Sequence, residues 1–171
     1  GAMIIGAGFV AQAGFIPDVP WHLAWWLGHA TTFGVTGPAA PALRRLIAVE
    51  DEHSESFRDY TTLEWWRVPA TTHERHITGP YVDYLCTYDY TLTVTMPVYS
   101  APTHSTPTHS EPALIGMAGV DSSVKHIESL LLPQLFAIGC AATVVNASAR
   151  VVASSDPHRA SGSILRIAGL S

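Results

Sequence analysis

Four segments of the chain decide its fold: DYTTLEWWRVP (59–69), GPYVDYLC (79–86), YTLTVTMPVYS (90–100) and ALIGMAGVDSS (113–123). In the third segment Leu92, Val94 and Met96 alternate with three threonines, which is the period of a half-buried strand. The second segment alternates in the same way. Aromatic rings and carboxylates are concentrated in these segments, so we expect them to form the wall and rim of a pocket for a small polar molecule rather than a reaction centre.

Length and composition indicate a single globular domain over residues 1–171. Apolar residues make up 47% of the chain, and the net charge is −5. The sequence has no Lys/Arg run of the kind that binds nucleic acid, and no apolar run of the roughly 18 residues that span a bilayer. A basic segment typical of a signal peptide is also absent from the N-terminal residues, which is compatible with a domain excised from a longer protein.

The region before these segments is expected to begin with a strand over Ile4–Ala13, which is apolar and β-branched. Residues 15–28 are expected to hold a short helix, because Trp21, Trp25 and Trp26 then fall at helical spacing. We interpret these rings as core packing against the sheet, and a lid over a ligand is the alternative. The remaining expectations are a loop over 31–42 and a strand or short helix over 43–49.

Between residues 56 and 80 the pattern predicts a short helix and then a loop. Tyr60, Leu63 and Trp66 share one helical face, and Pro69 is expected to end the helix. The loop contains the sequence THERH, in which the two histidines are three residues apart. A zinc-binding HExxH motif requires histidines four apart on a helix, so surface histidines are favoured over metal ligands at His73 and His76.

The last third of the chain is expected to hold a helix and a hairpin. Residues 100–112 contain two PTHS units and predict a polar loop. Asp121–Ser123 are expected to end a strand and to cap a helix that begins at Val124. Two short strands, Ala141–Val145 and Arg150–Ala153, predict a hairpin at the edge of the sheet. We interpret the two cysteines as buried free thiols at Cys86 and Cys140.

Sequential strands with helices between them predict an α+β fold. From Tyr60 onward the chain resembles a Cache domain, the PAS-like small-molecule sensor module common in bacterial receptors. The pieces that carry the resemblance are EWWRVP, GPYVDYL, LTVTMPVY, LIGMAGVDSSVKHIESLLL and NASARVVASSD, in the family's order over about two-thirds of the chain. The resemblance implies a curved antiparallel β-sheet of about five to six strands with flanking helices, and a ligand pocket on one face.

The resemblance also implies a binding role for particular residues. Trp65 stands at the tryptophan of the amino-acid-binding pattern R-x-W-Y, where Leu63 replaces the arginine, so another arginine (Arg58, Arg67 or Arg75) is needed to meet a carboxylate. Asp121 stands at the aspartate that grips a ligand amine in many such domains. Aromatic faces and carboxylates are also the groups that bind an ammonium on chemical grounds. The expected ligand-binding residues are Tyr60, Trp65, Trp66, Arg67, Tyr81, Asp83, Tyr84 and Asp121.

These observations favour a sensor domain that binds an amine-bearing or amino-acid-like metabolite and needs no cofactor. We expect the domain to relay binding to an output domain or partner protein, and a homodimer is a further expectation. The resemblance suggests an extracytoplasmic location. One alternative is an interaction or dimerisation domain with a vestigial pocket. The other is a small metal-dependent hydrolase, which is disfavoured because the sequence lacks a nucleophile elbow, a phosphate loop and a metal triad. The histidines available to such an enzyme are His73, His76, His104 and His109.

Overall fold

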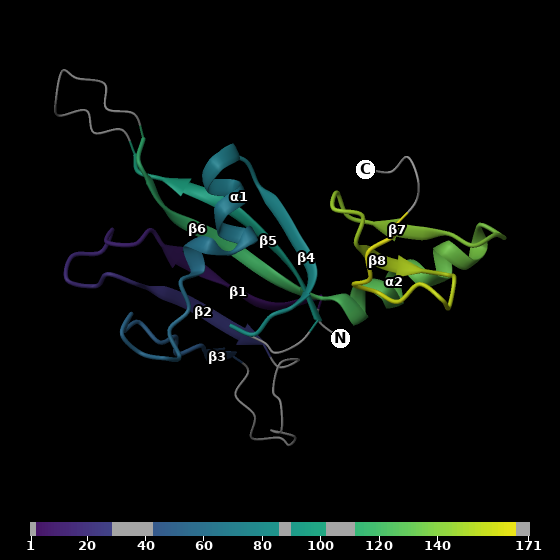
Figure 1. Cartoon of the computed structure of the whole chain (residues 1–171), viewed down its shortest axis with the longest axis horizontal. Helices are drawn as coiled ribbons and strands as arrows, with labels where there is room; N and C mark the ends of the chain where they lie inside the picture. The colour runs from purple at the N-terminus through teal and green to yellow at the C-terminus, as the bar shows by residue number, and fades with distance from the viewer. Residues whose placement is uncertain (1–2, 29–42, 86–89, 102–111, 167–171) are drawn as a thin grey trace.

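The computed structural model describes residues 3–28, 43–85, 90–101 and 112–166 (Figure 1). The predictions for the loop over 31–42, the PTHS units, His104, His109 and Cys86 lie outside these residues. The described elements are β1 (Ile4–Ala11), β2 (Leu23–Gly28), β3 (Leu43–Arg45), the 3-10 helix η2 (Tyr60–Thr62), α1 (Glu64–Thr72), β4 (His76–Val82), β5 (Tyr90–Tyr99), β6 (Leu114–Ser123), α2 (Val124–Ala137), β7 (Thr143–Val145) and β8 (Val151–Ser154).

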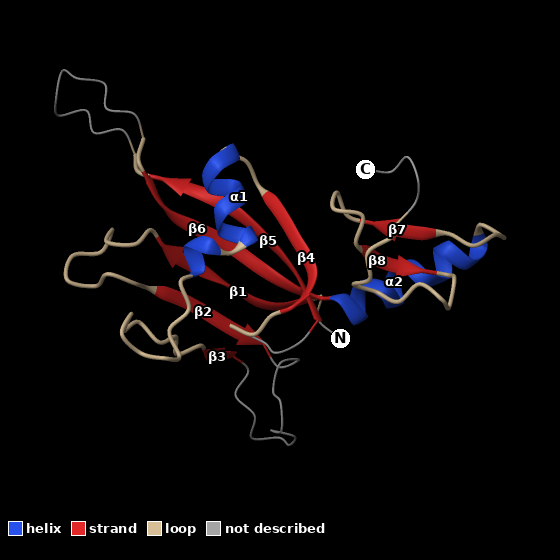
Figure 2. Cartoon of the chain, viewed as in Figure 1, coloured by secondary structure: helices blue, strands red, loops and turns tan. Residues whose placement is uncertain are grey.

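Six of these strands form one antiparallel sheet in the order β3-β2-β1-β6-β5-β4, and β7 and β8 form a separate hairpin (Figure 2). The two central strands, β1 and β6, are distant in sequence and pair along almost their whole length. The predicted α+β fold with an antiparallel sheet of five to six strands and flanking helices is therefore confirmed.

One face of the sheet is buried beneath α1, which lies across β4 and β5 (Figure 1). Residues paired directly across antiparallel strands project to the same face. A single row across β4, β5, β6, β1 and β2 is buried on this face, and its larger members are at most 5% exposed. Its residues are Thr78, Thr93, Asp121, Gly6 and Leu27.

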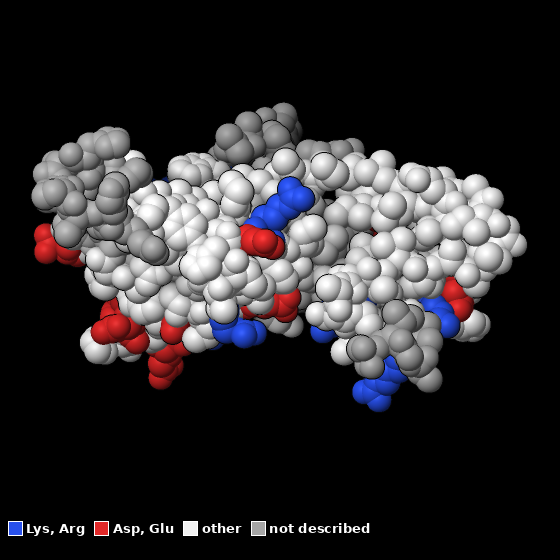
Figure 3. All heavy atoms as spheres, turned by 90° about the horizontal axis from the view of Figure 1, so that it is seen from above, with Lys and Arg blue, Asp and Glu red and all other residues white. Residues whose placement is uncertain are grey.

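The opposite face of the sheet is much more open. The adjacent row, displaced by one residue on each strand, ends in exposed apolar side chains, with Ile77 55% and Trp26 43% exposed. Met96 of β5 is exposed on this same face. Figure 3 views the whole molecule from above and is not restricted to this face; there the charged side chains lie in a few separate groups, and much of the visible surface carries none. The residues of this open row are Ile77, Val94, Val120, Ala7 and Trp26.

Three sequence predictions in the first half of the chain are wrong. The segment from Leu23 to Gly28 is a strand, so Trp25 points into the core and Trp26 to the open face. Strand pairing with β1 outweighs the helical spacing of the tryptophans. Pro69 lies inside α1 rather than at its end. Proline has no N–H to donate to the carbonyl of Trp65 four residues earlier, and that carbonyl accepts a hydrogen bond from Thr95 Oγ1 instead. The expected loop after Pro69 holds the end of α1 and the start of β4.

The C-terminal unit consists of α2 and the β7–β8 hairpin, which pack against each other beyond one end of the sheet (Figure 1). Leu92 of β5 contacts this unit through a small apolar cluster with Val124 and Val152. The hairpin forms a sheet separate from the main one, so its predicted place at the edge of the main sheet is wrong. Cys140 is a free thiol as expected, but it is exposed rather than buried, because it follows the end of α2.

Candidate functional site

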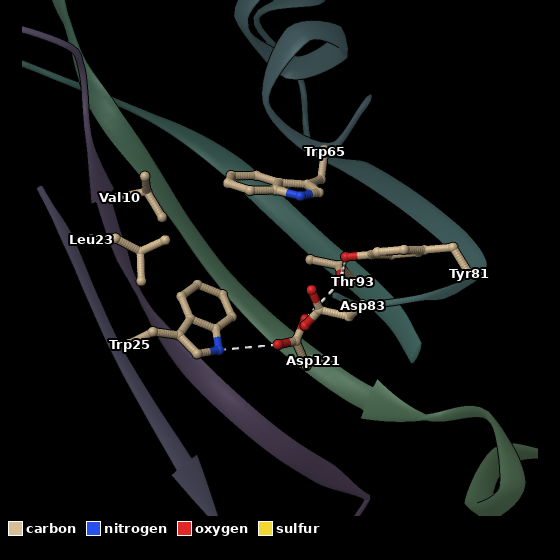
Figure 4. Close-up of a pocket in the computed structure, with 8 residues that line it drawn as sticks. All are labelled: Val10, Leu23, Trp25, Trp65, Tyr81, Asp83, Thr93 and Asp121. Carbon is tan, nitrogen blue, oxygen red and sulfur yellow. Dashed lines mark hydrogen bonds between the residues drawn. The ribbon is translucent and has the colours of Figure 1, made fainter. Parts of the chain in front are cut away.

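A small internal cavity lies between the buried face of the sheet and α1 (Figure 4). The volume open to the centre of a water molecule is about 10 Å³, which is room for a single water. Aromatic and aliphatic side chains form most of its wall, and two carboxyl groups and a hydroxyl form the rest. The residues that line it are Val10, Leu23, Trp25, Trp65, Tyr81, Asp83, Thr93 and Asp121.

Asp121 is the most deeply buried acid of the described residues and is 1% exposed. Its carboxylate accepts a hydrogen bond from Trp25 Nε1 at 3.0 Å and another from Thr93 Oγ1 at 2.6 Å. Of the predicted strand end and helix cap at Asp121–Ser123, the boundary is confirmed, because β6 ends at Ser123 and Ser123 is the N-cap residue of α2. Ser123 makes no capping hydrogen bond through its side chain, and Asp121 takes no part in the cap. A carboxylate this buried is retained by its hydrogen-bond donors and not by a helix end.

Glycines make room for the Trp25 indole beside this acid. A Cβ atom on Gly6 would lie 2.7 Å from Trp25 Nε1 and 3.0 Å from Asp121 Oδ2. A Cβ on Gly8 would lie 2.7 Å from the same ring, and one on Gly119 would lie 3.0 Å from it. Any larger residue at Gly6 would therefore separate the indole from the carboxylate.

The electrostatics of Asp121 are unusual for an aspartate. The pKa of Asp121 is raised from 3.8 to about 7, mainly by burial and in smaller part by the negative charge of Asp83, against the hydrogen bonds from Thr93 and Trp25, which lower it. Asp83 follows β4, is 3% exposed and accepts a hydrogen bond from the backbone of Leu85. Two buried carboxyl groups thus share one small cavity, an arrangement that favours a bound cation.

Tyr81 and Trp65 close the cavity on the side of α1. A bulge in β4 between Thr78 and Tyr81 sets the Tyr81 ring so that its hydroxyl lies 2.8 Å from Thr93 Oγ1. The backbone carbonyl of Trp65 accepts a hydrogen bond from Thr95 Oγ1 at 2.6 Å, which fixes the first turn of α1 to β5. The Tyr81 hydroxyl and the Trp65 backbone are thus both attached to the buried threonine face of β5.

An outer groove adjoins the cavity and shares Trp65, Tyr81 and Asp83 with it. The volume open to the centre of a water molecule in the groove is about 420 Å³, enough for a small metabolite. A neighbouring hollow of about 350 Å³, beside His22 and Glu50, meets the groove at its rim. The other residues of the groove are Arg58, Leu63, Glu64, Thr78, Val82, Tyr84 and Leu85.

The residues predicted from sequence are distributed over the cavity, its rim and the core. Trp65, Tyr81, Asp83 and Asp121 line the cavity together. Tyr84 is 74% exposed at the rim of the groove. The remaining three lie elsewhere: Tyr60 and Trp66 are buried in the aromatic core next to Trp65, and Arg67 is exposed on α1 and lines neither cavity nor groove.

Four residues of the cavity were not among the predicted site residues: Val10, Leu23, Trp25 and Thr93. The helical spacing of the tryptophans predicts a helix at Trp25. A strand at this position, paired with the glycines of β1, places Trp25 on the buried face of the sheet. Thr93 could have been found from the alternation of β5, because the threonines form its more buried side. Arg58, the only one of the three arginines considered that lines the groove, was named as an alternative carboxylate partner.

The structure adds two observations on metals and membranes. Among the residues that it describes, no group of three or more His, Cys, Asp or Glu side chains could hold a metal ion. His76 instead pairs with Glu64 at 3.0 Å, and His73 contacts Tyr99. In the described part of the chain, each helix is too short or too polar to cross a bilayer.

No family model matches the sequence, and no curated protein matches it significantly. Solved structures do resemble the fold. Methyl-accepting Chemotaxis protein X superposes with a TM-score of 0.57 and 16% identity over 98% of this chain and 57% of that one. The extracellular domain of the candidate histidine kinase soHK1S-Z6 superposes with a TM-score of 0.58 and 14% identity, over 92% of this chain and 49% of that one. The extracellular domain of the candidate histidine kinase mmHK1S-Z3 superposes with a TM-score of 0.52 and 12% identity, over 88% of this chain and 49% of that one.

The chain spans about half the length of these three proteins. At such low identity the likeness establishes the fold and not the ligand. The chain thus shares its fold with these receptor and kinase domains, and this α+β fold is consistent with the Cache-like architecture that the sequence resemblance implied.

Proposed function

We propose that this chain is a sensor domain that binds a small metabolite through a primary ammonium group. The observation that carries the proposal is the pair of buried carboxyl groups, Asp83 and Asp121, in a cavity walled by aromatic rings. Burying two like charges together is unfavourable unless a cation or a proton compensates them. A ligand ammonium would supply that compensation.

The size of the cavity supports a primary amine. An ammonium head has about the size of a water molecule, and the cavity has room for a single water. A trimethylammonium group adds methyl groups for which no space exists between Trp65 and Asp121. The proposal therefore includes discrimination between a primary amine and its N-methylated analogue.

Each wall of the cavity has a proposed role. Asp121 and Asp83 accept hydrogen bonds from the ammonium, and each charge-assisted bond of this kind contributes about 1.5–3 kcal/mol. The faces of Trp65 and Tyr81 add cation–π attraction of about 0.5–2 kcal/mol. The outer groove takes the rest of the metabolite, and in an amino-acid-like ligand Arg58 would face the carboxylate.

Calorimetric titration with pentylamine and with its trimethylammonium analogue tests the proposal. The wild-type chain should bind pentylamine, and the trimethylated compound should bind at least tenfold more weakly. Asp121→Asn should lose tenfold or more in affinity, because one charge-assisted bond is removed. Glu74→Gln, which removes an exposed carboxylate outside the site, is the matched control. Equal affinity for both compounds, or an unaffected Asp121→Asn variant, would contradict the proposal.

The structural resemblance to receptor domains supports three further parts of the proposal, which concern signalling, location and catalysis. We propose that binding is relayed to an output domain or partner protein, that the domain acts outside the cytoplasm and that it has no catalytic activity. A shift in α1 could carry the signal, because Trp65 links the cavity wall to this helix.

A second candidate function is an interaction or dimerisation domain, and the observation that favours it is the open face of the sheet. Trp26, Ile77 and Met96 expose apolar surface there, and exposed apolar patches mark association sites. Light scattering on the wild type and on Ile77→Thr distinguishes it: a dimer lost in the variant, together with no amine binding, would favour this candidate over the sensor.

A further inference from the structure

Thr78 of β4 has a buried hydroxyl group without a hydrogen-bond partner. The residue is 5% exposed, and within the described part of the chain its Oγ1 is the only buried side-chain polar atom that lacks a partner. Buried polar groups of this kind are nearly always satisfied, because leaving one unpaired is destabilising. An exception next to a groove indicates a position where a ligand supplies the missing partner.

The position of Thr78 connects it to the proposed ammonium site. It lines the outer groove, it is paired across the strands with Thr93, and Thr93 is paired with Asp121. The three side chains therefore lie in one row on the buried face, with Thr78 farthest from the ammonium cavity. Thr78 itself lines the groove, and rotation about χ1 moves Oγ1 between staggered positions, so its hydroxyl can turn to meet a group bound there.

The charges of the lining restrict what Thr78 can meet. Three carboxyl groups, those of Glu64, Asp83 and Asp121, line the cavity and groove, against one guanidinium. That guanidinium, Arg58, is exposed and donates through Nη1 to the backbone carbonyls of Glu55 and Phe57. An anionic group on the ligand is disfavoured in such surroundings, whereas a hydrogen-bond donor is favoured.

We propose that Thr78 is a specificity-determining residue whose hydroxyl accepts a hydrogen bond from a second donor group on the ligand, at the end opposite the ammonium. The ligand class is then a short primary amine that carries a distal amino or hydroxyl group, and not an α-amino acid. This inference rests on the proposed function of the Asp83–Asp121 cavity and adds the second point of recognition.

Calorimetric titrations with diaminobutane and pentylamine test this inference, because the two compounds have the same length and differ only in the distal group. The wild-type chain should bind diaminobutane at least tenfold more tightly, since a hydrogen bond to a charged group is involved. Thr78→Val should abolish this preference, and Thr78→Ser should retain it. Thr71→Val, which removes an exposed threonine hydroxyl on α1, should leave the preference unchanged.

A second readout uses the ligand-free protein. Thr78→Val should raise the melting temperature, because it removes an unpaired buried hydroxyl without leaving a cavity. A lowered melting temperature would mean that the hydroxyl has a structural partner, and it would overturn the inference. Equal affinities of the wild type for the two amines would also overturn it while leaving the proposed function intact. Failure of both amines to bind would overturn the proposed function and this inference with it.

Discussion

The raised pKa of Asp121 makes the stability of the ligand-free protein depend on pH in a defined direction. The pKa of Asp121 is 3.8 when unperturbed and about 7 in the folded chain, mainly because of burial. The folded state therefore binds the proton more tightly than the unfolded state. The contribution of this proton binding to the stability of the fold is fully present below pH 3.8 and is lost as the pH rises toward 7.

The magnitude follows from the size of this pKa change. Each pKa step corresponds to about 1.4 kcal/mol, so the whole change is worth about 4 kcal/mol. Between pH 5 and pH 8, the part of this range that is convenient to measure, the free energy of unfolding should fall by about 2–3 kcal/mol through Asp121 alone.

The Asp121→Asn variant removes this ionisation while its side chain keeps nearly the same shape. Its carbonyl can accept from Trp25 Nε1, and its amide can donate to Thr93 Oγ1, whose own proton can turn to Tyr81. We expect the variant to be more stable than the wild type at pH 8, with the difference narrowing or reversing at pH 5.

Urea unfolding followed by tryptophan fluorescence at pH 5, 6, 7 and 8 measures the effect. Glu74→Gln removes an exposed carboxylate, and its free energy of unfolding should equal that of the wild type at each of these pH values. If wild type and Asp121→Asn lose stability in parallel between pH 5 and 8, Asp121 ionises normally. The buried acid would then have no need of a cation, and the physical basis of the binding proposal would be lost.

Three further predictions concern the same region. Because an ammonium favours the ionised carboxylate, amine affinity should fall about tenfold per pH unit below 7 and level off above it, as measured by calorimetry; a flat profile would rule out coupling to Asp121. Gly6→Ala should destabilise the chain by about 1–3 kcal/mol in urea unfolding, because the added Cβ meets Trp25 and Asp121. Gly28→Ala should be close to neutral, because the nearest atom to its added Cβ is 3.6 Å away, and similar values for the two variants would refute the crowding argument. Tyr60→Phe should cost about 1–2 kcal/mol because its hydroxyl donates to the Ala11 carbonyl at 2.8 Å, and an unchanged urea midpoint would show that water replaces this bond.

Much of the sheet could be predicted from the sequence because β5 and β6 carry strong local signals. The alternation in Thr91–Met96 has the period of a strand, and the segment ending in Asp121 is bounded by turn-forming residues on one side and a helix on the other. The periodicity did not reveal which side of β5 is buried. The threonines face the core because their hydroxyls bond to Asp121 and to the backbone of Trp65.

The failures have a common physical origin in pairing between distant strands. Trp25 has neighbours at helical spacing, but the indole is stabilised by packing on glycines of β1 and β6, which no local pattern reveals. Asp121 has the position of a helix cap in sequence, yet its partners are Trp25, 96 residues away, and Thr93, 28 residues away. The residues that belong to the candidate site could be named only where the family resemblance supplied the long-range information.

A crystal structure of the chain grown with diaminobutane tests the central claim most directly. The account predicts electron density for one ammonium between Asp83 and Asp121 beneath the Trp65 ring, with the other end of the molecule in the outer groove toward Thr78. Density for the amine only in the neighbouring hollow beside His22 and Glu50, with a lone water in the cavity, would contradict it.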